Sequence, residues 1–274
     1  MPSILSDSGI RVFYQEDNFT DPWKNRPTLI LQHGNGRSGQ FWNRWIPYLA
    51  PHFRIIRPDM RGVGQSSGAP LDTITIENCI KDLVQIIHQT QSGSVYFCGE
   101  SMGGILGIIL AAQHPELVKS LTLIATPVFI NAVMKERYAL GFSSRLEAMR
   151  VLGIKDWVRK TSILTRFPPD AEPELIDWYV DEFAKSDPEK LIHYSDLVSN
   201  ANAQAFLSKI QCPTLAIFPQ NGQITDAEQE KILASQIANI QVTHIPSEFH
   251  MIHLTHVKEC AQLLLAHLEV SGPT

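Results

Sequence analysis

Short apolar runs alternate with helix-like stretches through the first half of this 274-residue chain. A short run of consecutive apolar residues predicts a buried strand, and apolar residues three or four positions apart predict a helix. By these criteria the first half contains strands at 10–14, 28–32, 53–57, 94–98 and 121–125, and helices at 76–89 and 105–112. Strands that alternate with helices in this way predict a parallel sheet covered on both faces.

The pattern changes after Pro127. From residue 128 to about residue 208 helical periodicity dominates, and no convincing strand interrupts it. The strand rhythm returns at 213–218 and 241–245, with helices at 227–237 and 257–268. We therefore expect an α/β core formed by residues 1–127 and 209–274, interrupted by a helical cap at residues 128–208.

Composition and charge narrow the classes of function. Hydrophobic residues make up 44% of the chain, which is enough for a large core, and the net charge of −5 comes from interspersed acidic and basic residues. No like-charged run favours nucleic acid or an anionic membrane as a partner. The four cysteines form no CxxC pair, no signal peptide is evident, and no apolar run approaches the ~20 residues of a membrane span. These features predict a cytoplasmic protein with reduced thiols.

A glycine-rich turn joins the apolar strand at 94–98 to the helix that follows. Its sequence is Gly-Glu-Ser-Met-Gly-Gly at 99–104, which contains the G-x-S-x-G pattern in the required strand–turn–helix context. A serine in such a turn sits in a strained backbone, and the flanking glycines remove Cβ atoms that would clash with neighbouring elements. The helix N-terminus offers backbone N–H groups to an anion. We expect Ser101 to be a catalytic nucleophile.

A second loop follows the strand at 28–32 and reads His33-Gly34-Asn35-Gly36. Where a G-x-S-x-G turn carries the nucleophile, the oxyanion hole takes one N–H from the residue after the nucleophile and one from a loop of this kind. Met102 and Asn35 are therefore the predicted oxyanion donors. His33 itself is expected to hydrogen-bond to backbone, because it has no evident proton to transfer.

The general base is expected among ten histidines. His250 lies just after the last predicted strand and before the last helix, whereas His253 and His256, the two alternatives, fit the spacing of that helix. His250 is the predicted base, and activity should fall as one group protonates near pH ~6–7. No group of residues has metal-ligand spacing, so neither a metal nor another cofactor is expected.

Together these segments resemble the α/β-hydrolase superfamily over the whole chain outside the insertion. The matching elements are His33 to Gly36, an Asp-x-Arg-Gly-x-Gly-x-Ser element at 59–66, the turn at 99–104 and His250. The chain is similar to 3-oxoadipate enol-lactonases and bacterial carboxylesterases. The resemblance implies a mostly parallel eight-stranded sheet flanked by helices, a helical cap over the nucleophile, and a structural role for the element at 59–66.

The resemblance also reveals a departure. The family order is serine, acid, histidine, and superposing its pattern on the chain puts Gly222 in the usual acid position. Three substitutes stay open: Asp226, which also fits a helix N-cap, Asn221 as a neutral partner, and Glu248, two residues from His250. A fourth option is that no side chain orients the histidine.

The expected function is hydrolysis of a small or medium carboxylic ester or lactone through an acyl-enzyme. Two alternatives are carbon–carbon bond hydrolysis or a lyase reaction on the same scaffold, and a ligand-binding homologue with slow turnover. The expected partner is the small-molecule substrate, with a homodimer as an option. Of the cap arginines Arg137, Arg145, Arg150 and Arg159, any could hold a substrate carboxylate, although arginines on helices more often face solvent.

Overall fold

A computed structural model describes residues 2–6, 9–24 and 26–270, and contains one sheet of eight strands. The strand order is β1-β2-β4-β3-β5-β6-β7-β8, with β1 and β2 antiparallel to their neighbours and all later pairs parallel. The strands are β1 (Ser3–Leu5), β2 (Arg11–Asp17), β3 (Thr28–Gln32), β4 (Arg54–Pro58), β5 (Val95–Glu100), β6 (Val118–Ile124), β7 (Thr214–Pro219) and β8 (Ile240–Ile245). This arrangement confirms the predicted mostly parallel sheet.

Both faces of the sheet are covered, because the central strands are apolar on both sides. In β3, Ile30 belongs to one core cluster, and its neighbours Leu29 and Leu31 belong to the other. The first cluster contains side chains of α2 (Ile76–Gln89), α3 (Met102–Gln113) and α10 (Ala227–Gln236). The second contains side chains of η1 (Gly39–Trp45), α1 (Ile46–Leu49) and α12 (Val257–Val270). Alternation of side chains along each strand therefore divides the core into two layers.

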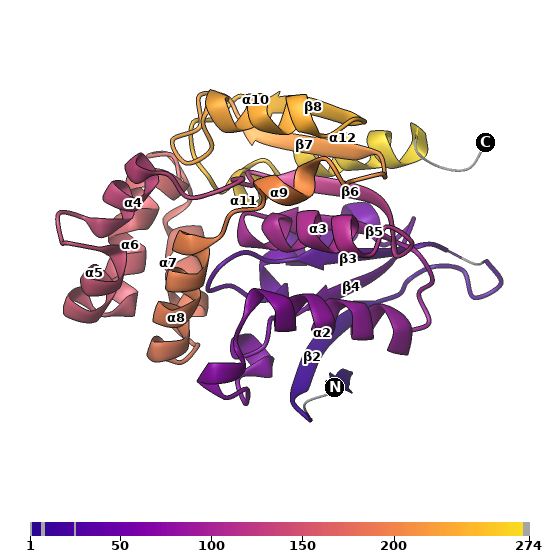
Figure 1. Cartoon of the computed structure of the whole chain (residues 1–274), viewed down its shortest axis with the longest axis horizontal. Helices are drawn as coiled ribbons and strands as arrows, with labels where there is room; N and C mark the ends of the chain where they lie inside the picture. The colour runs from indigo at the N-terminus through magenta and orange to yellow at the C-terminus, as the bar shows by residue number, and fades with distance from the viewer. Residues whose placement is uncertain (1, 7–8, 25, 271–274) are drawn as a thin grey trace.

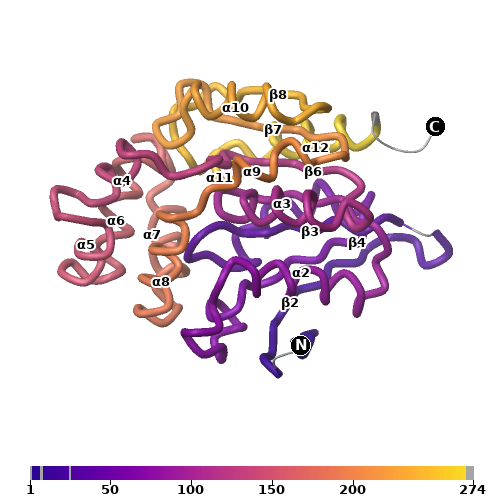
Figure 2. The backbone as a smooth tube through the Cα atoms, in the orientation of Figure 1, coloured from indigo at the N-terminus to yellow at the C-terminus, as the bar shows by residue number. Residues whose placement is uncertain are grey.

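The chain between β6 and β7, where every residue is described, forms helices and one isolated bridge between Phe129 and Asn202. We call α4 to α8 the helical insertion. Its helices are α4 (Ala132–Ala139), α5 (Arg145–Leu152), α6 (Ile154–Thr161), η4 (Ser162–Arg166), α7 (Pro173–Phe183) and α8 (Pro188–Asn200), followed by α9 (Gln204–Leu207). The helices of the insertion, α4 to α8, gather at one end of the sheet, on the left of Figures 1 and 2.

Local signals explain where the insertion helices begin. The side chains of Asn131, Ser144 and Asp187 accept backbone N–H bonds at the starts of α4, α5 and α8. The insertion also contributes buried aromatic side chains, including Trp157 and Tyr179. It is therefore packed tightly enough to position side chains over the sheet.

Most predicted elements match the observed ones to within a few residues. The helix at 76–89 and the strand at 28–32 coincide with α2 and β3. The residue pattern did not reveal β1, whose three residues are too short for periodicity to register. All four cysteines are free thiols. In the described part of the chain, no helix is long and apolar enough to cross a membrane.

Candidate active site

The turn between β5 and α3 holds Ser101 in a backbone conformation that few residues adopt. Its φ of 54° and ψ of −118° lie in a region that side chains with a Cβ rarely occupy. A Cβ on Gly99 would overlap the backbone of Gly103, and a Cβ on Gly103 would overlap the carbonyl oxygen of Gln32. The glycines thus let strand, turn and helix approach closely enough to hold Ser101 in the strained position.

Ser101 is partly exposed and lines a small cavity between the sheet and the helical insertion. The cavity volume is about 30 Å³, and its wall includes Ser101, His250 and Asn35. A water molecule fits such a space, whereas ligand pockets usually measure several hundred Å³. The structure therefore brings these three predicted site residues together around a space that is too small for a substrate unless neighbouring side chains move.

Met102 is the first residue of α3 and is fully buried directly after Ser101. Backbone N–H groups in the first turn of a helix have no partner within that helix. Asn35 comes from the loop after β3, and its side-chain Nδ2 donates to Ser195 Oγ of α8 at 3.1 Å. The helical insertion thus packs directly on the predicted oxyanion loop.

His250 is anchored by the backbone of the insertion. Its N–H donates to the Thr165 carbonyl oxygen at 3.0 Å, and the N–H of Met251 donates to the Arg166 carbonyl oxygen at 3.0 Å. Burial lowers the pKa of His250 well below its usual value, and the positive charges of Arg37 and Arg166 lower it further. The imidazole is therefore neutral at pH 7, which is the state a general base requires.

Neither ring nitrogen of His250 is joined to Ser101 by a hydrogen bond, and Nδ1 has no partner among the described residues. Catalytic hydrogen bonds often form only when substrate is bound. The free Nδ1 is the nitrogen that a triad acid would ordinarily orient.

The other candidate histidines are held elsewhere. His33 Nε2 accepts the N–H of Met60 at 3.0 Å, and its Nδ1 lies 2.8 Å from the Gly34 carbonyl oxygen, so both nitrogens bond to backbone as expected. Burial lowers the pKa of His33 to about 3. His253 is buried, and His256 Nδ1 lies 2.9 Å from Thr255 Oγ1. Of the described histidines, His250 is the one in the cavity wall.

None of the substitutes for the acid is placed to orient His250. Asp226 caps α10, accepting the N–H of Gln229 at 3.1 Å. Glu248 and Asn221 are exposed. At Gly222, an added Cβ would lie 2.7 Å from Pro219 Cγ and 2.9 Å from the Thr225 carbonyl oxygen. The usual acid position therefore has no room for an aspartate unless this loop shifts.

The carboxylate nearest His250 among the described residues is Glu100, the residue before Ser101. Its Oε1 lies 3.4 Å from His250 Nε2, and its other oxygen is paired with the Arg37 guanidinium. Glu100 is fully buried, and burial raises its pKa although Arg37 opposes the shift. A Cβ on Gly34 would overlap this Arg37–Glu100 pair, which explains the glycine in the loop.

Sequence reasoning missed Glu100 because it occupies a variable position of the G-x-S-x-G pattern. Side chains alternate between the two faces along β5, which indicates only that the side chains of Glu100 and Ser101 point in different directions. A charged residue two positions after the apolar run at 94–98 was the available signal, since an unpaired buried carboxylate is costly.

The element at 59–66 has the structural role that the resemblance implied. Asp59 accepts the N–H groups of Gly39 and Gln65 at 2.7 and 2.8 Å. Arg61 forms a buried ion pair with Asp82 at 2.5 Å. These bonds tie the loops around β4 together beside the site.

A sequence profile described as the alpha/beta hydrolase fold matches residues 27–257. The chain belongs to the α/β-hydrolase family. Ser101 and His250 both lie within the matched region, so the two predicted catalytic residues stand in the part of the chain that defines the family.

Several known hydrolases are similar to this α/β hydrolase. RutD of Serratia proteamaculans, whose name gives carbamate hydrolysis as a provisional activity, is 24% identical over 88% of this chain and 91% of its own. 3-Oxoadipate enol-lactonase 2 of Acinetobacter baylyi is 23% identical over 87% and 85% of the two chains. The crystal structure of the enol-lactonase of Burkholderia xenovorans superposes with a TM-score of 0.86, 23% identity, and coverage of 98% and 100%. The protein is thus a hydrolase of this family.

Proposed function

We propose that this protein is a serine hydrolase that cleaves a small or medium carboxylic ester or lactone through an acyl-enzyme. His250 accepts the proton of Ser101 Oγ, and Oγ attacks the carbonyl carbon. The N–H groups of Asn35 and Met102 hold the oxyanion, and His250 then protonates the leaving alcohol. Water activated by His250 releases the acid. These steps use no cofactor.

The observation that carries the proposal is the strained backbone of Ser101 in the wall of a cavity shared with neutral His250. Strain of this kind persists only where surrounding structure enforces it, and it concentrates at functional sites. The enol-lactonase relative supports a lactone or ester as the bond cleaved. We propose the helices at 128–208 as the cap that closes over this site.

Active-site labelling tests the proposal directly. A fluorophosphonate reacts covalently with an activated serine, so intact-mass measurement should find one adduct per chain. Turnover should then appear on a panel of p-nitrophenyl esters and simple lactones, with the carboxylic acid as product. Labelling without turnover would instead favour the slow ligand-binding homologue, and cleavage of a diketone but no ester would favour carbon–carbon hydrolysis.

The pH profile offers an independent check on His250. Because burial and two arginines lower its pKa, the neutral, active form persists to lower pH than for an ordinary histidine. We therefore expect kcat/KM to stay level from pH 8 down through the usual histidine value of about 6.5, and to fall only below it. This places the acidic limb lower than the sequence alone suggested.

Samples held at each acidic pH and assayed again at pH 7 separate reversible protonation from unfolding. A limb centred above pH 7 would show that the titrating group is not buried His250.

A further inference from the structure

The wall of the active-site cavity carries more positive than negative charge. Arg37, Arg145 and Arg166 all line it, and all three are buried. Among the described residues, the carboxylate that pairs with one of them is Glu100, which is bound to Arg37. With neutral His250, two guanidinium charges therefore remain without a matching anion in the described structure.

Arg145 lies at the start of α5 and has few polar partners. Its Nη1 donates to Ser199 Oγ at a long 3.4 Å, and its buried Nε has no partner among the described residues. The guanidinium stacks over the rings of Tyr138 at 4.8 Å and Trp157 at 5.5 Å. Burial lowers the pKa of Arg145 to about 10, so it is still protonated at pH 7. A charged donor thus faces the cavity with unused hydrogen-bonding capacity.

Arg166 ends η4 and shares the same aromatic surroundings. Its Nη1 donates to the Val158 carbonyl oxygen at 3.3 Å and to Thr161 Oγ1. Its guanidinium lies 5.4 Å from the Tyr138 ring and 5.3 Å from the Trp157 ring. Arg145 and Arg166 therefore hold two like charges over one pair of rings, an arrangement that costs free energy unless an anion joins it.

We propose that Arg145 and Arg166 form the binding site for a carboxylate group of the substrate, so that this hydrolase acts on an anionic ester or lactone. The inference rests on the proposed function, because it assigns the substrate class of the same site. Guanidinium groups suit this role, since their planar donors match the two oxygens of a carboxylate. The cation–π contacts keep both arginines in place while no anion is bound.

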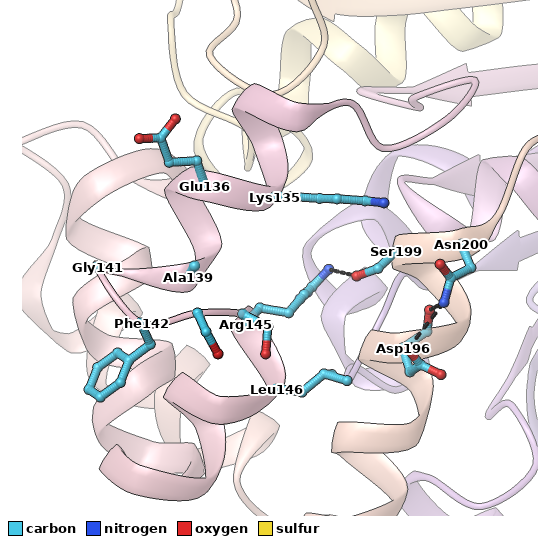
Figure 3. Close-up of a pocket in the computed structure, with 12 residues that line it drawn as sticks. Lys135, Glu136, Ala139, Gly141, Phe142, Arg145, Leu146, Asp196, Ser199 and Asn200 are labelled. Carbon is cyan, nitrogen blue, oxygen red and sulfur yellow. Dashed lines mark hydrogen bonds between the residues drawn. The ribbon is translucent and has the colours of Figure 1, made fainter.

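A second pocket outside the cavity reaches Arg145 from another side. It has a volume of about 490 Å³, lies between α4, α5 and α8, and shares Arg145 with the active-site cavity. Figure 3 shows Arg145 at its centre, bonded to Ser199, with the side chain of Lys135 pointing across towards α8. The long Arg145–Ser199 bond is the weak contact that a substrate carboxylate would replace on entering.

Two esters, one with a free carboxylate and one without, test the proposal. One is the mono-p-nitrophenyl ester of glutarate, which keeps a free carboxylate, and the other is the same compound with that carboxylate capped as a methyl ester. For the wild-type protein we expect kcat/KM to favour the anionic ester by ~10- to 100-fold, as charge-assisted hydrogen bonds would give. Arg145→Met should remove most of this preference, and Arg145→Lys should restore part of it.

Arg150→Met is the matched control, because Arg150 is an exposed arginine on the same helix. It should leave the preference unchanged. Thermal unfolding of each variant shows whether it is still folded, so that a changed substrate preference is not caused by unfolding. High salt should weaken the wild-type preference, since screening reduces the attraction between the charges.

Calorimetric titration with glutarate separates this proposal from the proposed function. Glutarate should bind the wild-type protein and bind Arg145→Met at least ~10-fold more weakly, whether or not any ester is turned over. Arg145-dependent glutarate binding without ester cleavage would retain the anion site and reject the hydrolase mechanism. Ester cleavage with no preference for the anionic ester and no glutarate binding would overturn the anion site alone.

Discussion

Replacing Ser101 by alanine should lower kcat on the best ester by ~10⁶, the loss typical when a catalytic serine is removed. Alanine removes only the Oγ atom, and it meets the same backbone strain at φ 54°. The fold should therefore survive while the nucleophile is lost. Steady-state kinetics with purified protein, together with the mass of the fluorophosphonate adduct, measure both consequences.

Ser235→Ala is the control for this variant, because Ser235 is an exposed serine of α10, far along the chain from the turn. It should keep wild-type turnover and one adduct per chain. Unchanged labelling in Ser101→Ala would remove Ser101 from the nucleophile's role, whatever the turnover.

Glu100→Gln should produce the second largest effect. Glutamine keeps the shape of the side chain but removes the charge beside His250 Nε2 and leaves Arg37 without its buried partner. If Glu100 stabilises the imidazolium formed during attack, kcat should fall by ~10²- to 10³-fold, as when one electrostatic contact of a catalytic site is removed. Loss of the negative charge should also move the acidic limb of kcat/KM to lower pH, which a purely structural defect would not do.

Two matched variants separate Glu100 from the carboxylates suggested by the sequence. Asp226→Asn and Glu248→Gln make the same change of charge at a helix cap and at an exposed position. Both should retain kcat within about threefold. Asparagine also serves as an N-cap at position 226, and Glu248 is exposed. Wild-type turnover in Glu100→Gln, combined with a large loss in either of the other two, would return the acid's role to that residue.

The sequence by itself determined the sheet and the glycine-flanked turn at Ser101, because both depend on short-range patterns. Apolar runs such as 28–32 form strands whose two faces are both buried in the sheet. The order of strand, glycine, serine, glycine and helix determines the turn around Ser101 locally. The position of His250 after the last strand predicted that it lies near Ser101, since the carboxyl ends of parallel strands meet at one edge of the sheet. β1 escaped because three residues carry no measurable period.

Only the tertiary structure decided which charged side chains reach the cavity. Glu100 lies next to Ser101 in the chain, but its contact with His250 spans 150 positions and depends on how β5 and the last loop pack. Helical periodicity could not distinguish buried Arg145 from exposed Arg150, and it gave no sign of Arg166 at the end of η4. Charged side chains become buried and paired through contacts between segments that are distant in the sequence. No local sequence pattern predicts the free energy of those contacts.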